Sequence, residues 1–383
     1  MRPAIIISCV LLILALLADD VNGQENEYGI TDEIKQILLE NCKNQPGGCD
    51  ADNEEFKKKR NGVKESLVDE LEFEEGLSEE EAANKVEERL QKIQELKALI
   101  HAEMGISEIP PADDGLFEGD IILTTEQAQA MIDEIRGRAK RSASFFFETF
   151  PQFLWNMPIR YWVNATEFNE QHSNVFHDSV NTITQAVPCI RFQKDDAPLK
   201  SGSQIIFRRI PDSCGGNSPI GHDGINRINV GVGEYCDGEE FKKTIIHEVI
   251  HSLGGGHEQA RTDRDKYVEI LWKNINSVST GDFEVFQGST SYGTPYDYKS
   301  IMHYGLTSGS KNGEDPTMRA LQGSQTQLGG SSLTTNDILQ LKRMYCSKCT
   351  DKTHECGTQA LNGGCSQEQT RTQCQRSCGQ CDQ

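Results

Sequence analysis

Three histidines and a glutamate are spaced so that they could bind and use a metal ion. Positions 247–257 read HEVIHSLGGGH. On a helix, residues four apart share a face, so His247 and His251 can direct both imidazoles at one ion. Gly254 stands where the chain must leave the helix, and the turn can bring His257 round as a third ligand. Three neutral nitrogens leave a fourth position for water, as in catalytic zinc sites, and Glu248 can reach that water as general base.

The residues after this motif extend it into a longer pattern. Positions 258–265 read EQARTDRD directly after His257, and positions 300–304 read SIMHY. Metzincin proteases carry a methionine turn beneath their zinc ligands, and Met302 stands where such a turn would lie. The string HExxHxxGxxHE, followed by RxDRD and SxMHY, resembles the astacin family of zinc endopeptidases.

This resemblance implies a role for individual residues. One Zn²⁺ ion per chain would be held by three ligands, which are His247, His251 and His257. Glu248 would be the catalytic base, Met302 the hydrophobic floor, and Tyr304 a phenol that binds zinc or swings to the transition-state oxyanion. A tyrosine hydroxyl suits that second task because it donates a hydrogen bond without carrying a charge.

Two features depart from the family pattern. An aromatic residue commonly follows the glycine of the motif, whereas this chain has Gly255, so we expect a looser loop. In astacins the freed N-terminus can reach the glutamate after the third histidine, here Glu258. The segment 142–155 is longer than that arrangement needs, so either further trimming occurs or the ion pair is absent.

The elements that must position these residues follow from the same resemblance. The expected fold is α+β, the two-lobed metzincin protease with the cleft between its halves. The N-terminal half carries a twisted sheet and two long helices, and the later helix, at about 239–253, holds the first two ligands. Leu154-Trp155 and positions 158–163, PIRYWV, are typical of a first strand. Beyond Gly254 we expect a mostly irregular half. Asn164 opens an NAT sequon and is expected to be glycosylated.

The first 141 residues have a different composition. An apolar run at 4–17 after Arg2, followed by small residues near 21–23, predicts a secretory signal peptide and a secreted protein. These 141 residues hold 32 of the 59 acidic residues and 16 of the 38 basic ones. Positions 53–104 are dense in Glu, Lys and Leu at helical spacing, which predicts solvated helices and no nucleic-acid surface. No later apolar stretch is long enough to span a bilayer.

Two motifs predict that this acidic segment keeps the enzyme latent. The basic cluster RAKR at 138–141 precedes Ser142, which indicates cleavage after Arg141 by a furin-like protease. Positions 117–120 read FEGD, and astacin precursors have a similar FxGD pattern whose aspartate occupies the open zinc position. A carboxylate can displace the water there, so Asp120 is the expected latency switch.

The 13 cysteines mark separate parts of the chain. Cys42 and Cys49 lie close together in the acidic segment and are expected to pair locally. In the enzyme region the family pattern implies two disulfides, Cys189–Cys346 and Cys214–Cys236.

The last six cysteines lie within 33 residues, too few for an adequate core, so cross-links must hold this part together. The segments CTD at 349–351 and CxxxCxxC at 374–381 resemble a ShKT module. Six cysteines allow 15 connectivities, and the resemblance implies Cys349–Cys381, Cys356–Cys374 and Cys365–Cys378. Zinc binding by these thiols is the competing interpretation, disfavoured by the secretory context. The lysine–aromatic pair of channel-blocking ShKT peptides is missing between Cys365 and Cys374, which favours a binding or stabilising appendage with an unknown partner.

The sequence therefore predicts a signal peptide (1–23), a pro-segment (24–141), an astacin-like catalytic domain (142–348) and a ShKT module (349–381). Together they would form a secreted zymogen of a zinc metalloendopeptidase that cuts internal peptide bonds of extracellular proteins, with water activated by Glu248. A non-catalytic binding protein on this scaffold would need Glu248 or a ligand to be missing. A toxin acting through the ShKT module is the third possibility. Venom, matrix, digestive and developmental roles stay open.

Overall fold

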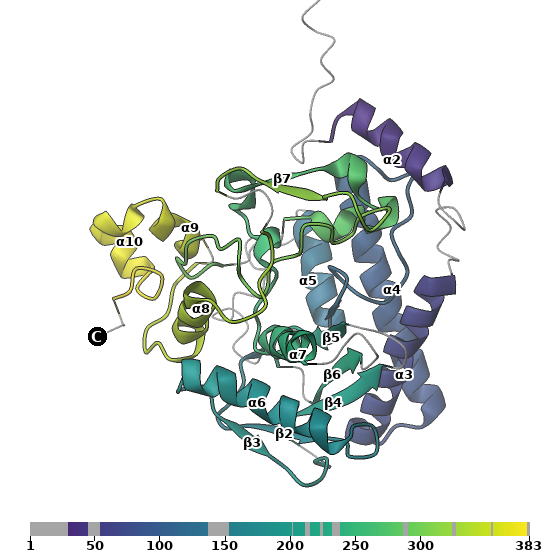
Figure 1. Cartoon of the computed structure of the whole chain (residues 1–383), viewed down its shortest axis with the longest axis vertical. Helices are drawn as coiled ribbons and strands as arrows, with labels where there is room; N and C mark the ends of the chain where they lie inside the picture. Colours follow the sequence, from purple (N-terminus) through teal and green to yellow (C-terminus); the bar gives the residue numbers. More distant parts are fainter. Residues whose placement is uncertain are drawn as a thin grey trace, which may run out of the picture.

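A six-stranded sheet lies beside the helix that carries the histidine motif (Figure 1). The computed structural model describes residues 30–44, 54–136, 153–200, 202–210, 215–222, 225–231, 238–285, 290–323, 327–353 and 355–380. In spatial order the strands are β1 (Ile121–Ile122), β5 (Gly216–Pro219), β6 (Ile225–Gly231), β4 (Gln204–Ile210), β2 (Ile159–Val163) and β3 (Phe192–Lys194). β5 runs antiparallel to β6, and all other neighbours pair in parallel. The predicted first strand is confirmed as β2 for its second part, 158–163, whereas Leu154 and Trp155 lie before it and outside any strand.

Two long helices pack on one face of this sheet. They are α6 (Glu170–Ala186) and α7 (Glu239–Ser252), and the predicted ligand-bearing helix at about 239–253 is confirmed as α7. Phe176 of α6 contacts both Phe207 of β4 and Phe241 of α7 in a buried cluster. Aromatic pairs prefer defined geometries, and these two join α6 to β4 and to α7.

The opposite face of β6 is covered by residues of the predicted pro-segment. Because side chains alternate along a strand, Ile228 faces the helices while Arg227 and Asn229 face the other way. Nη2 of Arg227 donates to the carbonyl oxygen of Asp69 at 3.0 Å, and Asn229 bonds Ser66 at 3.1 Å. Both partners belong to α3 (Glu54–Glu75), so the predicted catalytic domain is enclosed by the segment that precedes it.

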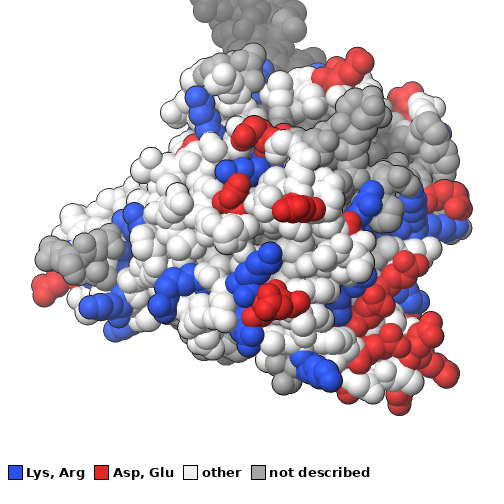
Figure 2. All heavy atoms as spheres, turned by 60° about the horizontal axis from the view of Figure 1, so that its bottom comes forward, with Lys and Arg blue, Asp and Glu red and all other residues white. Residues whose placement is uncertain are grey.

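The helices of the predicted pro-segment share a core with the C-terminal half. They are α2 (Asp32–Asn44), α3, α4 (Glu79–Glu103) and α5 (Thr125–Ile135). Leu90 and Ile93 of α4 belong to the same buried cluster as Trp272 and Phe283. The helices at 53–104 are confirmed, but the expectation that they are simply solvated is incomplete. Their charged faces are exposed, and Figure 2 shows acidic side chains gathered on the side of the molecule where α3 and α4 lie.

The C-terminal half is mostly irregular, as expected. It contains the short helices η2 (Glu258–Ala260), η3 (Arg264–Lys266), η4 (Trp272–Asn274) and η5 (Ser277–Phe283), the strands β7 (Val268–Ile270) and β8 (Met318–Ala320), and α8 (Thr335–Tyr345). Asp337 caps α8 and also accepts hydrogen bonds from Ser300 Oγ (2.6 Å) and Ile301 N (3.3 Å). A disulfide between Cys189 and Cys346, one of the expected pairs, ties the end of α8 to the early sheet.

A small disulfide-linked unit forms the C-terminal end (yellow in Figure 1). It contains α9 (Cys356–Leu361), η6 (Gly364–Ser366) and α10 (Glu368–Gln373). Its disulfides Cys356–Cys374 and Cys365–Cys378 are two of the expected pairs. The unit packs on the catalytic part: the guanidinium of Arg376 lies 5.6 Å from the ring centre of Tyr292.

Several predicted features lie outside the described residues. They are the signal peptide, the Arg141–Ser142 cleavage site, Cys49, the Cys214–Cys236 pair and Cys381. Across the described ranges, no helix has both the length and the apolar character needed to cross a membrane.

Candidate metal centre

The helix that carries the first two histidines ends in a glycine turn. Gly254 has φ 102°, and its N–H donates to the carbonyl oxygen of His251 at 2.7 Å. The N–H of Gly255 donates to the carbonyl oxygen of Ile250 at 2.8 Å. These two bonds form a Schellman motif, which requires a left-handed residue and so favours glycine. A Cβ on Gly255 would lie 2.5 Å from Ile250 Cγ2, so the turn is tightly packed and the looser loop expected from the sequence is not observed.

The ligand histidines of this helix are oriented by backbone carbonyls. Nδ1 of His247 lies 2.8 Å from the carbonyl oxygen of Ile301, and Nδ1 of His251 lies 2.7 Å from that of Gly255. A carbonyl oxygen only accepts, so Nδ1 carries the proton in the neutral rings and Nε2 keeps its lone pair. Imidazoles that bind metals are held in this way.

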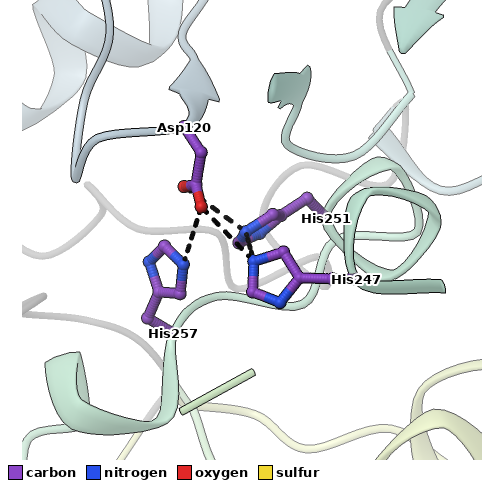
Figure 3. Close-up of side chains that lie close together, drawn as sticks. All are labelled: Asp120, His247, His251 and His257. Atoms are coloured by element: carbon purple, nitrogen blue, oxygen red, sulfur yellow. Dashed lines mark hydrogen bonds and ion pairs between the residues drawn. The ribbon is translucent and has the colours of Figure 1, made fainter. Parts of the chain in front are cut away.

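Four potential ligand atoms converge between α7 and the pro-segment (Figure 3). They come from Asp120, His247, His251 and His257 and lie within 4.8 Å of one another. The Nε2 atoms of His247 and His251 are 3.0 Å apart, and the Asp120 oxygens lie 3.3–3.6 Å from the three Nε2 atoms. Corners of a tetrahedron with zinc–ligand bonds of about 2.0–2.1 Å would be about 3.3–3.4 Å apart. The donor set and its spacing therefore fit a four-coordinate zinc ion.

Asp120 lies directly before β1, the strand that the predicted pro-segment adds to the sheet. Its carbonyl oxygen accepts from the N–H of Ser218 at 3.0 Å, which aligns β1 with β5. Burial would raise the pKa of the Asp120 carboxyl, but the neighbouring His257 and His247 outweigh this, and the pKa is lowered. The charged Asp120 carboxylate therefore occupies the open side of the three-histidine set.

Glu248 lies next to this centre and keeps one carboxylate oxygen free of hydrogen bonds. The residue is 2% exposed, and Oε2 has no hydrogen-bond partner among the described residues. Ser218 Oγ donates to the Glu248 backbone carbonyl at 3.0 Å. A Cβ on Gly216 would come within 2.7 Å of Glu248 Cγ and Oε1, so only glycine leaves room for this side chain. Burial raises the pKa of Glu248 well above its ordinary value, and the Asp120 charge adds to the effect.

The predicted methionine turn follows on the other side of the histidines. Met302 is buried, its carbonyl oxygen accepts from Glu258 N at 2.9 Å, and it belongs to the same core as α7. The Tyr304 ring lies 4.7 Å from the His257 ring, centre to centre, and its hydroxyl donates to the backbone oxygen of Glu118. The phenol is therefore engaged by the pro-segment. Burial and the nearby carboxylates, Asp120 first, raise the Tyr304 pKa well above its ordinary value.

Glu258 is buried and already has partners within the catalytic part. Its Oε1 accepts from Arg261 Nη1 at 2.9 Å and from Asp297 N at 2.7 Å. Burial raises the pKa of Glu258 to about 7, although the Arg261 charge opposes the change. Arg261 also pairs with Asp263 at 2.9 Å, so the RxDRD segment supplies the charge balance around Glu258 in this form of the chain.

Sequence reasoning missed three residues near this centre. Glu118 fills the variable position of the FxGD pattern, and Gly216 lies outside any motif, so neither had a signal in the sequence. Lys97 did have one, because it shares a helical face with the buried Ile93 and Ile100. Its ammonium is buried and lies 2.9 Å from Asp114, beneath the loop that carries Asp120.

Two protein-family models match the chain. A model of the Astacin peptidase family matches residues 147–346, about half of the chain. A ShK domain-like model matches residues 348–381.

The chain is also similar to individual proteins, one of them a zinc metalloproteinase by name. Zinc metalloproteinase nas-9 of Caenorhabditis elegans is 32% identical over 331 residues, which are 78% of this chain and 59% of that protein. Meprin A subunit alpha of Mus musculus is 32% identical over 256 residues, which are 63% of this chain and 30% of that protein. Among solved structures, High choriolytic enzyme 1, a hatching enzyme zinc-protease from Oryzias latipes, matches with 25% identity and a TM-score of 0.44, covering 51% of this chain and 95% of that one.

Proposed function

Because the chain belongs to the astacin family of zinc metalloendopeptidases, we propose that it is secreted as a zymogen and hydrolyses internal peptide bonds of extracellular proteins after activation. Residues 1–23 would be removed as the signal peptide, 24–141 would form the pro-segment, 142–348 the catalytic domain and 349–381 the ShKT module. One observation carries the proposal. Three histidine Nε2 atoms of the catalytic part and one pro-segment carboxylate meet at a single point.

The residues of this centre divide the reaction between them. A zinc ion held by His247, His251 and His257 would supply a Lewis acid that polarises the scissile carbonyl and lowers the pKa of water. Glu248, with its free carboxylate oxygen, accepts the proton of the attacking water and delivers it to the leaving amine. Tyr304 donates its hydroxyl hydrogen bond to the oxyanion of the tetrahedral intermediate.

The edge of the sheet provides a place for an extended substrate. β1 pairs with β5 through Ile121–Ser218 and Ile122–Pro219, and β6 lies on the other side of β5. Once β1 leaves, β5 presents unpaired N–H and C=O groups beside the histidines. Such an edge binds a further extended chain through backbone hydrogen bonds, independently of most side chains. This suits an enzyme that cuts peptide bonds within longer proteins.

Latency follows from three contacts of one pro-segment loop. Asp120 occupies the open side of the histidine set, the hydroxyl of Tyr304 bonds the Glu118 carbonyl, and β1 fills the edge of the sheet. Ligand position, oxyanion donor and substrate edge are therefore all blocked together. Cleavage between Arg141 and Ser142 by a furin-like protease would allow this loop to leave.

The experiment compares the purified precursor with the chain cleaved at Arg141, each assayed for zinc content and for hydrolysis of casein. We expect zinc in both and activity only after cleavage, with cleaved Glu248→Gln retaining zinc and losing activity. Asp120→Ala should give the uncleaved precursor only a low activity, because the open position is no longer filled by a carboxylate while β1 still fills the substrate edge. A cleaved wild type that binds zinc and stays inert, or a Glu248→Gln variant as active as wild type, would refute the proposal.

A further inference from the structure

The three histidines differ in the origin of the group that orients them. Nδ1 of His247 and His251 face backbone carbonyls of the catalytic part, those of Ile301 and Gly255. Nδ1 of His257 instead lies 2.8 Å from Oε2 of Glu118, which belongs to the pro-segment. Two of the three partners would therefore stay with the catalytic domain after activation, and the third would leave.

The Glu118 side chain is held firmly against this imidazole. Both side chains are almost completely buried, at 1% exposed for Glu118 and 0% for His257. Glu118 has φ 46°, a left-handed conformation that non-glycine residues rarely adopt. Its carbonyl oxygen accepts from the Tyr304 hydroxyl, and the following residue, Gly119, has φ 81°. Unfavourable backbone conformations that persist in folded proteins cluster at functional sites, and here the strain directs a carboxyl group at a ligand.

A carboxylate on the outer nitrogen of a histidine changes what the inner nitrogen can do. By accepting the Nδ1 proton in a hydrogen bond, Glu118 fixes the tautomer and ring orientation of His257 and makes its Nε2 more basic. A carbonyl oxygen has the same orienting effect with less charge. Among the described residues, the pro-segment thus supplies the strongest hydrogen-bond acceptor to an Nδ1 atom of the three histidines.

We propose that Glu118 is a positioning residue that strengthens zinc binding by the precursor through His257, so that activation loosens the metal as well as uncovering it. The inference rests on the proposed function, because it takes the three histidines as zinc ligands and the pro-segment as removable. It goes further by assigning the pro-segment a second contribution, separate from the Asp120 carboxylate. Asp120 acts at the open position, whereas Glu118 acts through its hydrogen bond with Nδ1 of His257.

The test measures zinc release from the full-length precursor, without any activity assay. Zinc-loaded wild type, Glu118→Gln and Glu118→Ala are mixed with a chromophoric chelator, and the release rate is recorded. Loss of an outer partner typically weakens metal binding by about 10–100-fold, so we expect release to be roughly 10-fold faster in Glu118→Gln and faster again in Glu118→Ala. Glu126→Gln, an exposed glutamate of α5, is the matched control and should release zinc at the wild-type rate.

A second readout separates this role from a purely structural one. Cobalt-substituted precursor should show a shifted visible absorption band in Glu118→Gln, since the amide keeps the shape of the side chain and lacks its charge. The effect should persist in an Asp120→Asn background, because it acts through His257. If wild type binds no zinc, the proposed function itself fails. If wild type binds zinc while Glu118→Gln has the wild-type release rate and spectrum, the role of Glu118 is overturned and the proposed function stands. Should Glu118→Ala fold poorly, the Gln variant decides alone.

Discussion

Replacing Gly216 by alanine should disable the proposed base while leaving the fold and the metal in place. Gly216 has no positive φ, so its backbone accepts alanine. The new Cβ would lie 2.7 Å from Cγ and Oε1 of Glu248 and 2.8 Å from Cδ. Ordinary carbon contacts begin near 3.4 Å, so the carboxylate must move by about 0.7 Å or more. The movement falls on the Glu248 side chain, because the contacts of the new Cβ are with its atoms and not with backbone.

The displaced carboxylate should slow the chemical step. A misplacement of about 1 Å at a reacting group can reduce the rate by about 10²-fold, which corresponds to about 2.7 kcal/mol in the activation free energy. We therefore expect kcat of the activated enzyme to fall by about 10²-fold, with KM changed little because the substrate edge of β5 keeps its backbone.

The assay follows cleavage of a quenched fluorescent peptide by the activated protein, together with its zinc content and thermal unfolding. Gly305→Ala is the matched control, because its Cβ would meet only Ser308 Oγ, at 3.5 Å, which is an ordinary contact. A Gly216→Ala enzyme within about threefold of wild type would show that the position of Glu248 is not critical, against our reasoning. Loss of zinc or a large fall in melting temperature would show that the change acts on the fold instead.

Three further predictions concern stability. Replacing Cys189 and Cys346 by serine removes a cross-link between residues 157 apart, which should lower the free energy of unfolding by about 5 kcal/mol in the chain-entropy account; an unchanged denaturant midpoint would contradict this. Lys97→Met leaves the buried Asp114 without its ammonium partner and should destabilise the precursor by about 3–5 kcal/mol. The measurement is a urea titration, and the activated enzyme, which lacks both residues, is the unaffected control. Burial lowers the pKa of His101 to about 4 from 6.5, so the unfolded chain binds a proton that the folded chain does not, and precursor stability should fall as pH decreases from 6.5 towards 4. His101→Gln should remove up to about 3 kcal/mol of that pH dependence. The free energy of unfolding is measured by urea titration at several pH values, and the same pH dependence in both proteins would contradict this prediction.

Much of the fold could be predicted because its signals are local. The spacing of His247 and His251 implied one helix, and α7 is that helix. The charge-rich repeat at 53–104 implied helices, which are α3 and α4. What the pattern did not reveal is that these helices bury their apolar faces against the C-terminal half, since a helical stripe specifies a buried face and not its partner.

The sequence by itself predicted the residues of this centre: the three histidines, the adjacent glutamate, and Asp120 of the predicted pro-segment. The histidines and the glutamate follow from residue type and from spacings of a few positions, which helix and turn geometry translate directly into space. Asp120 lies 127 residues from His247 and was expected only because FEGD resembles the FxGD pattern of astacin precursors. Only the tertiary structure decided which groups contact the outer nitrogen of His257 and the side chain of Glu248. Glu118 and His257 are 139 residues apart, and Gly216 meets Glu248 because β5 passes along α7. Such contacts depend on how the sheet, the helices and the pro-segment pack, and no short spacing in the chain encodes them.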